Sequence, residues 1–127
     1  MEHLIKTILS LSEGIRYMAI YSDGTLITSA REELQNASSS ESDKYEELIV
    51  NPTLLKLVTQ RGNIDCGGAE FVLIRYGHFF EFVKPVANGH VSIGIQLNED
   101  PLQTYSFDRR CDKQTRFINC DHRDHIH

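Results

Sequence analysis

The clearest pattern of apolar and polar positions lies between residues 69 and 97, where it predicts three consecutive strands. Residues 70–76 and 79–84 are rich in β-branched and aromatic side chains, which suit the pleated surface of a sheet. The third run alternates between apolar positions and polar or small ones, and its apolar members are Val91, Ile93, Ile95 and Leu97. This period of two places the apolar side chains on one face, which we expect to be buried.

Two short turns separate these strands. Gly77 and His78 fit a two-residue hairpin turn that needs a positive φ at its first position. Asn88 and Gly89 are typical of a type I′ turn, because both residue types tolerate a positive φ. The three strands therefore predict an antiparallel meander.

The amino-terminal part of the chain predicts a helix followed by a hairpin. Residues 3–12 carry apolar side chains at helical spacing, and Gly14 follows where a helix C-cap is expected. Residues 16–21 form a run that is apolar on both faces, which is typical of a buried strand. We expect this strand to pair with residues 25–29 through the Asp-Gly turn at residues 23–24.

The middle of the chain predicts a polar loop and then a helical region. Residues 31–44 hold little that could be buried, whereas residues 43–61 carry apolar side chains at helical spacing. Asn51 and Pro52 interrupt this region, so that one kinked helix and two short helices are both open. We expect Gly62 to end the helical region. The apolar side chains predicted to face the core at its start are Tyr45, Leu48 and Ile49.

Asp100 and Pro101 favour the start of a last helix. The full order of elements predicts an α+β fold, with a five-stranded antiparallel sheet and helices on both faces. Helices are expected on both faces because the strands near residues 17–21 and 71–76 are apolar on both sides. We expect one domain over residues 1–108 and a polar tail over 109–127.

The composition narrows the class of protein. A chain of 127 residues is long enough for a single core, and its net charge of −5 argues against a nucleic-acid partner. No apolar run is long enough for a membrane span, and the amino terminus lacks the pattern of a signal peptide. Three cysteines without a framework spacing fit a reducing compartment. We therefore expect a cytoplasmic protein.

Two passages of the chain resemble a known family. Residues 9–29, with the sequence LSLSEGIRYMAIYSDGTLITS, look like the passage from helix to first hairpin in the roadblock family of dynein-light-chain-like domains. The meander over residues 69–97 is similar to the second half of that family's fold, which is shared in outline with profilin and longin. The resemblance covers roughly residues 1–100. The chain departs from the family at Asn51 and Pro52, where members usually have one continuous helix, and in its tail.

The resemblance implies interaction rather than catalysis. Roadblock domains typically form dimers by pairing an edge strand and the long helix with their copies, and several bind or regulate small Ras-like GTPases. A long apolar edge strand that stays exposed is also prone to aggregation, so proteins usually cover it or pair it with another strand. We therefore expect a non-enzymatic homodimer without a cofactor, whose partner is a small GTPase or another protein. The predicted interface residues are Leu54, Leu55, Val58, Phe71, Leu73 and Arg75.

An alternative function follows from the aromatic residues of the meander. They could line a pocket for a small ligand between sheet and helix, as in a sensory module of PAS or profilin shape, although aromatic side chains in a meander more often form core. This alternative predicts an apolar pocket near Phe80 and Phe82. The members of the aromatic cluster are Tyr76, Phe79, Phe80 and Phe82.

Two groups of residues invite a chemical interpretation that we do not adopt. Cys66 precedes two glycines and would be accessible, but it would need His78 or His90 as a base, and we expect it to be incidental. The tail holds possible zinc ligands, but their spacing matches no zinc finger or ribbon, so we predict no metal site. These tail residues are Cys111, Cys120, His122, His125 and His127.

Overall fold

The structure is a computed structural model and describes residues 14–31 and 39–103. The predicted helix over residues 3–12 and the tail over 109–127 lie outside this part of the chain. The elements, in chain order, are β1 (Ile15–Ser22), β2 (Thr25–Ala30), α2 (Ser40–Tyr45), η1 (Glu46–Val50), α3 (Asn51–Asp65), β3 (Val72–Arg75), β4 (Phe80–Val86) and β5 (Gly89–Ile95).

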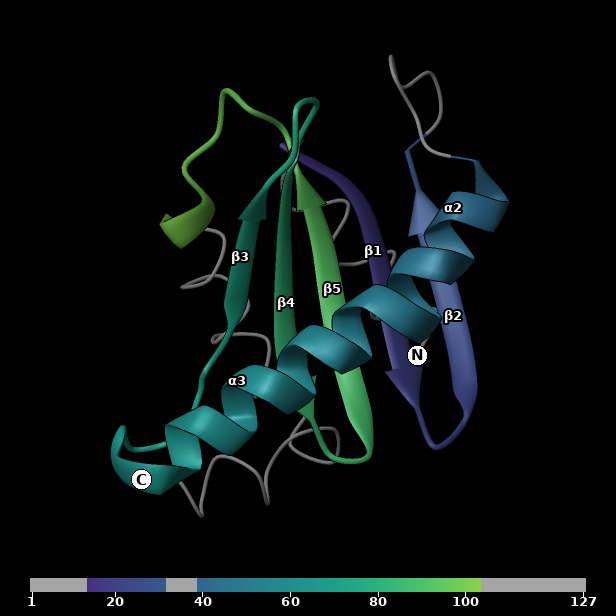
Figure 1. Ribbon diagram of the computed structural model, residues 1–127. Coiled ribbons are helices and arrows are strands. Elements are labelled where there is room, and N and C mark those ends of the chain that lie inside the picture. The colour runs from purple at the N-terminus through teal and green to yellow at the C-terminus, as the bar shows by residue number, and fades with distance from the viewer. Residues whose placement is uncertain (1–13, 32–38, 104–127) are drawn as a thin grey trace.

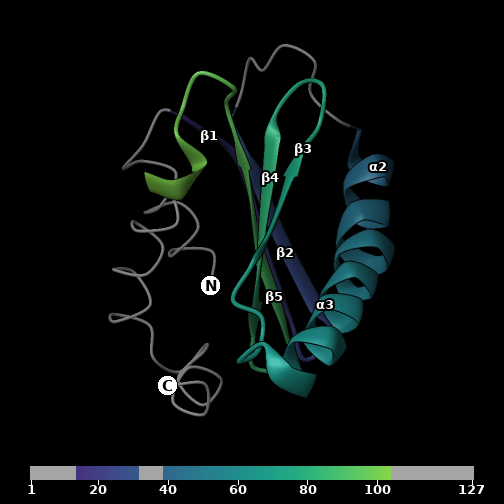
Figure 2. The ribbon, with the colours of Figure 1, turned by 60° about the vertical axis from the view of Figure 1, so that its left-hand side comes forward.

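The five strands form one antiparallel sheet in the order β2-β1-β5-β4-β3 (Figure 1). The predicted α+β fold with a five-stranded antiparallel sheet is therefore confirmed. The helical elements α2, η1 and α3 run diagonally across one face of the sheet (Figures 1 and 2). β2 and β3 are the two edges of the sheet within the described residues.

The other face of the sheet carries only a short helical turn within the described residues. This turn, at residues 101–103, lies on the side opposite to α3 (Figure 2). Its start follows the prediction, because the Asp100 side chain accepts a hydrogen bond from the Leu102 amide at 2.9 Å and its carbonyl accepts one from Gln103 at 3.1 Å.

The apolar core lies on the face of the sheet that is turned away from the long helix. Met18 pairs with Ile93, and Ile93 pairs with Phe82, so these three side chains form one row across β1, β5 and β4. Side chains alternate along a strand, and the neighbouring row belongs to the face under the helix. The buried members of the core are Ile15, Met18, Ile20, Phe82, Val86, Val91, Ile93 and Ile95.

The predicted turns are confirmed in one case and corrected in two. Asp23 and Gly24 both have positive φ, 52° and 81°, as a type I′ turn requires. The next turn is centred one residue before the predicted position: Asn88 has a φ of 59°, but Gly89 already pairs with Val86 in the sheet. Glycine is needed at position 89 because there is no room for a side chain: a Cβ there would collide with the backbone of β1 at Tyr21. The backbone conformation of Gly89 does not itself call for glycine, since its φ is not positive.

The hairpin between β3 and β4 has the predicted position but not the predicted conformation. It is closed by the Tyr76 amide, which donates to the Phe79 carbonyl at 2.9 Å. Gly77 does not adopt the positive φ that we expected at the first turn position. This hairpin therefore makes no special demand on glycine.

The helical region is one continuous helix with a π-helical segment, which settles the question that Asn51 and Pro52 left open. Residues 46–50 form η1, in which the Asn51 amide donates to the Glu46 carbonyl five residues before it. Pro52 has no amide hydrogen to donate and falls in the first turn of α3. The wider π turn thus lies where the helix passes the proline.

The helix turns a different face to the sheet from the one predicted. Tyr45, Leu48 and Ile49 were predicted to point inward, but 63%, 45% and 52% of their surfaces are exposed. Glu47 and Asn51 point inward instead, and both are completely buried. The prediction was wrong because it assigned the apolar face of the helix to the sheet, whereas the opposite face carries Glu47 and Asn51, four residues apart, which bond to polar groups.

Gly62 does not end the helix, contrary to the prediction. α3 continues to Asp65, and the left-handed residues that redirect the chain are Gly67 and Gly68, with φ of 78° and 92°. Gly62 is buried because the returning chain crosses it: a Cβ there would lie 2.7 Å from the carbonyl carbon and oxygen of Gly68. None of the helices in residues 14–31 and 39–103 is long and apolar enough to cross a membrane.

Candidate functional site

A network of buried polar groups lies between η1 and the sheet, and Glu47 is its centre. The Glu47 side chain is completely buried and its carboxylate is surrounded by four hydrogen-bond partners from three strands or helices. The distances are 3.0 Å from the Tyr17 hydroxyl, 3.1 Å from the Asn51 amide, 2.8 Å from Nε2 of His90 and 2.6 Å from the Ser92 hydroxyl. This carboxylate is therefore fully satisfied by protein groups.

Glu81 of β4 is the second buried carboxyl group. Only 1% of its surface is exposed. Its Oε2 accepts a hydrogen bond from Asn51 Nδ2 at 3.2 Å, and a further hydrogen bond joins its carboxyl group to that of Glu46, which requires one of the two to carry a proton. Oδ1 of Asn51 is buried without a partner among the described residues. Unsatisfied buried polar atoms are rare in folded proteins and call for a physical explanation.

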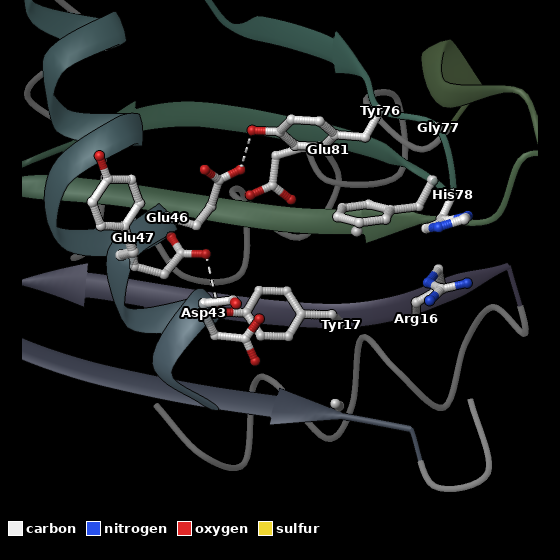
Figure 3. A pocket seen from close by; sticks show the side chains of 14 residues that line it. Arg16, Tyr17, Asp43, Glu46, Glu47, Tyr76, Gly77, His78 and Glu81 are labelled. Atoms are coloured by element: carbon white, nitrogen blue, oxygen red, sulfur yellow. Dashed lines mark hydrogen bonds between the residues drawn. The ribbon is translucent and has the colours of Figure 1, made fainter. Parts of the chain in front are cut away.

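A pocket of about 450 Å³ opens beside this network, between the helix and the sheet. Figure 3 shows the carboxyl groups of Glu46, Glu47 and Glu81 turned toward a common space, with Arg16 and His78 at the other end. The aromatic rings of Tyr17 and Tyr76 form parts of its wall. The further lining residues are Ala30, Ser42, Asp43, Tyr45, Gly77, Phe79 and Gly94.

Burial and the neighbouring carboxylates make the ionisation of several carboxyl groups in the pocket less favourable. Burial, and then the charges of Glu47 and Glu46, raise the pKa of Glu81 well above its ordinary value of 4.5. Burial also raises the pKa of Glu46, although the hydrogen bond from Tyr76 opposes this shift. The pKa of Asp43 is raised by burial and by the charge of Glu47. The pocket thus gathers carboxyl groups whose protonated, neutral forms are favoured by their surroundings.

Two tyrosines act as hydrogen-bond donors to these carboxylates. The Tyr17 hydroxyl donates to Glu47, and the Tyr76 hydroxyl donates to Glu46 at 2.7 Å (Figure 3). Burial and the adjacent carboxylates raise the pKa of both phenols, burial being the larger cause in each case. Both tyrosines therefore stay protonated and keep donating across the physiological pH range.

The basic end of the pocket is engaged with its own surroundings. The Arg16 guanidinium lies 5.4 Å from the centre of the Phe79 ring and donates to Gln96 Oε1 at 3.3 Å. Arg16 is buried, whereas His78 is exposed in the β3–β4 hairpin. The Phe79 ring and the Gln96 side chain thus both contact the Arg16 guanidinium at the rim of the pocket.

The structure divides the aromatic cluster predicted from the sequence between the two faces of the sheet. Tyr76 and Phe79 line the pocket, with ring centres 5.3 Å apart. Phe82 belongs to the core on the opposite face, and Phe80 packs against that core. The pocket between sheet and helix that the alternative function requires is therefore present. It lies beside Tyr76 and Phe79, and not beside Phe80 and Phe82 as predicted.

The six predicted interface residues do not lie on one surface. Leu73 and Arg75 lie on the edge strand β3, where 37% of the Leu73 surface is exposed. Val58 is exposed to 36% on α3, whereas Leu55 is buried. Phe71 stacks on Phe82 of the core, with ring centres 5.0 Å apart. The sixth residue is Leu54, which is partly buried on α3.

Cys66 is an exposed free thiol at the end of α3, and it donates a hydrogen bond to Asp65 Oδ1 at 3.3 Å. The β3–β4 hairpin that carries His78 lies at the far end of the molecule from this helix end (Figure 1). His90 is buried against Glu47. The structure therefore does not bring either histidine into use as a base for Cys66. The five possible zinc ligands of the tail lie outside the described residues.

The sequence analysis missed Glu47, Asn51 and Glu81 as site residues. Glu47 lies in an acidic stretch that is typical of a solvated helix start. Glu81 carries the more useful signal, because it is a charged residue between two phenylalanines of a predicted strand. Its position between Phe80 and Phe82 places it on the face opposite to theirs, which is the face under the helix.

Comparisons with known proteins identify no family for this chain. No family model matches it, and no curated protein matches it in sequence. Among solved structures it is similar to MglC from Myxococcus xanthus, with 11% sequence identity and a TM-score of 0.47, over 78% of this chain and 82% of that chain. The resemblance to the roadblock family therefore stays a prediction from the sequence.

Proposed function

We propose that this protein is a non-enzymatic interaction domain that forms a homodimer through the β3 edge and the adjoining helix. The observation that carries this proposal is the open β3 edge beside apolar surface. Among the described residues β3 pairs with β4 alone, and its exposed side chains include Leu73. An edge strand with apolar side chains tends to pair with another strand.

The hydrogen bonding of the hairpin indicates which backbone groups of β3 are free to pair. Tyr76 and Phe79 form the hydrogen-bonded pair next to the turn. Hydrogen-bonded and non-hydrogen-bonded pairs alternate in an antiparallel ladder, so Ile74 bonds to β4 and the amides of Leu73 and Arg75 point outward. The outward groups of these two residues are the ones that a second β3 strand would meet.

The outer surface of the helix adds apolar area to the proposed interface. Leu57 and Ile64 are seven residues apart on the same side of α3, and 59% and 75% of their surfaces are exposed. Leu48 and Ile49 of η1 are exposed as well. This stripe of exposed apolar residues on a helix is typical of a protein–protein contact.

Light scattering over a wide concentration range, on the full chain and on Leu73→Pro, tests this proposal. Proline at position 73 removes an amide that points away from β4, so the sheet should survive while edge pairing is blocked. We expect a dimer for the natural chain and a folded monomer for the variant. A natural chain that is monomeric at all concentrations would contradict self-association.

Thr28→Pro is a matched control on the other edge of the sheet. Ser22 and Thr25 flank the two-residue turn of the β1–β2 hairpin, so the same alternation points the Thr28 amide outward from β2. This variant should remain dimeric. If Thr28→Pro dissociates the dimer and Leu73→Pro does not, the interface belongs to β2 and the proposed β3 contact is wrong.

The class of partner follows from the resemblance seen in the sequence. Because roadblock domains include regulators of small Ras-like GTPases, we propose a small GTPase as the partner of the dimer. Binding of such GTPases in their GDP and GTP-analogue forms to the natural chain and to Leu73→Pro would test this. Preference for one nucleotide state, lost in the monomeric variant, is the expected result.

A second candidate function is the binding of a small ligand between sheet and helix. The observation that favours it is the pocket of about 450 Å³ beside Tyr76 and Phe79. Pockets of roughly 300–1,000 Å³ are the usual size for small-molecule sites. Ligand binding and self-association use different surfaces and can coexist.

A further inference from the structure

We propose that β2 is a docking edge for a partner protein, which adds to it one extended strand whose side chains alternate between basic and β-branched residues. The basic side chains lie on the helix side of the sheet and the β-branched ones on the opposite face. This inference goes beyond the proposed homodimer, which uses β3 at the other edge of the sheet. It rests on the open backbone of β2, on the accessibility of this edge and on the different surroundings of its two faces.

The backbone of β2 presents a row of hydrogen-bonding groups to the outside of the sheet. Among the described residues β2 pairs with β1 alone, in a register without interruption. Just beyond this ladder the Arg31 amide donates to the Arg16 carbonyl at 2.9 Å. Because hydrogen-bonded and non-hydrogen-bonded pairs alternate, every second residue of β2 turns its amide and carbonyl outward. These outward residues are Leu26, Thr28 and Ala30.

The sequence of β2 does nothing to prevent pairing at this edge. Proteins commonly protect an edge strand by making it very short, or by placing charged residues, proline or a bulge in it. β2 has six residues, TLITSA, and none of these features, whereas β3 has four residues and carries Arg75. The side chains of Thr25, Thr28 and Ala30 are exposed, so the edge is accessible. β2 is therefore suited to the addition of a strand.

The two faces of β2 have different surroundings, which determine the alternation of the partner strand. Residues that lie opposite each other in a ladder share a face. Ile27 pairs with Ile20 and packs against the apolar core. Ala30 pairs with Tyr17 on the other face, where it lines the pocket together with Asp43 of α2. A β-branched side chain of the partner would thus extend the apolar row, and its next side chain would lie on the helix side.

The charge beside β2 favours basic side chains on the helix side. Glu41 and Asp43 lie in the first turn of α2, which has no buried residue and lies over the end of β2 (Figure 1). Residues 32–47 contain six acidic residues and one lysine. The Arg31 guanidinium donates to the Ile15 carbonyl and is therefore turned toward β1. A basic strand would be attracted to this edge, whereas a second copy of β2 would bring like charges together.

Titration of the full chain with three capped hexapeptides, followed by calorimetry, tests the proposal. The basic probe is acetyl-Lys-Val-Lys-Val-Lys-Val-amide, and the neutral probe has threonine in place of each lysine. The third probe, acetyl-Lys-Lys-Lys-Val-Val-Val-amide, keeps the composition and charge of the basic one but loses the alternation. We expect the basic probe to bind at least about tenfold more tightly than either of the others. Equal affinity of the three, or no binding of the basic probe at millimolar concentration, would overturn the proposal.

Amide hydrogen exchange, measured by NMR, shows whether the basic peptide adds to β2. At a peptide concentration of about ten times its dissociation constant, exchange of the three outward amides of β2 should slow about tenfold. The amides of Leu73 and Arg75 on β3 should be unaffected. Slower exchange on β3 without any change on β2 would overturn the assigned edge. This measurement uses the natural chain and needs no substitution.

Thr28→Pro is the decisive variant, and Leu73→Pro is its matched control. Each removes one outward amide from an edge strand and leaves the hydrogen bonds to the neighbouring strand in place. We expect Thr28→Pro to weaken binding of the basic peptide by about tenfold or more and Leu73→Pro to leave it unchanged. Unchanged affinity of a folded Thr28→Pro chain would overturn the proposal, and if this variant does not fold, the exchange pattern of the natural chain decides. Light scattering reports the proposed dimer separately, so the two proposals can fail independently.

Discussion

Glu47 shows how a single buried carboxylate can organise the contact between a helix and a sheet. Its side chain is completely buried, and its two oxygens are shared by Tyr17, Asn51, His90 and Ser92. A buried charge of this kind is tolerated only because hydrogen bonds replace the lost water. Removing the acceptor leaves several buried donors without a partner.

We therefore expect Glu47→Gln to lower the free energy of unfolding by at least about 2 kcal/mol. The amide NH₂ of the glutamine is a donor, and it would face side chains that donate hydrogen bonds to the Glu47 carboxylate in the natural chain. Chemical denaturation at neutral pH measures this loss. Glu46→Gln is the control: Glu46 is half-buried and accepts from Tyr76, so its loss should be smaller, about 1 kcal/mol or less. Equal losses would contradict the central role of Glu47.

Glu81 leads to a prediction about pH. Its pKa is raised in the folded protein, so the folded state binds this proton more tightly than the unfolded state does. The stabilisation from that proton is complete below the ordinary pKa of 4.5 and is lost as the pH rises through the raised pKa. Asp43 and Glu46 shift in the same direction.

The contribution of Glu81 is measured by comparing the natural chain with Glu81→Gln in denaturation experiments from about pH 5 to about pH 8. The free energy of unfolding of the natural chain should decline relative to that of the variant as the pH rises, because glutamine carries no titrating proton. A constant difference between the two chains across this range would show that Glu81 has the same pKa in both states.

At the scale of the element, Gly62 provides a test of how α3 meets the chain that follows it. In an exposed helix, glycine to alanine would stabilise by up to about 1 kcal/mol. Here the added Cβ would lie 2.7 Å from the Gly68 backbone, so we expect Gly62→Ala to destabilise by about 1 to 3 kcal/mol. Thermal unfolding measures the change, with Gln60→Ala at an exposed position of α3 as control. Stabilisation by Gly62→Ala would contradict the close crossing.

The elements themselves could be predicted, but the phase of the long helix could not. The strands followed from alternating apolar residues and from short turns, which are local signals. Helical spacing indicates which side chains share a face but not which face meets the sheet. The prediction placed the apolar Leu48 and Ile49 inward, whereas the structure places Glu47 and Asn51 there. The polar site depends on hydrogen-bond partners on the strands and was therefore not predicted.

At the scale of the whole molecule, the sheet separates two unlike interiors. The face away from the helix holds the apolar core, which the sequence predicted through Val91, Ile93 and Ile95. The face under η1 holds the polar network around Glu47. The site could not be predicted because it joins residues of η1 and α3 to residues of β4 and β5 that are 30 to 45 positions away. Only the packing of the helix brings them together.

The two ends of the long helix are attached to the sheet in different ways. α2 has no buried residue, and η1 contacts the sheet through polar groups, whereas α3 buries Leu55. Water can replace hydrogen bonds but not apolar contacts, so the α2–η1 end is the part that detaches at the lowest cost in free energy. Local opening at this end would admit solvent to the polar network while β1, β4 and β5 stay protected from amide hydrogen exchange.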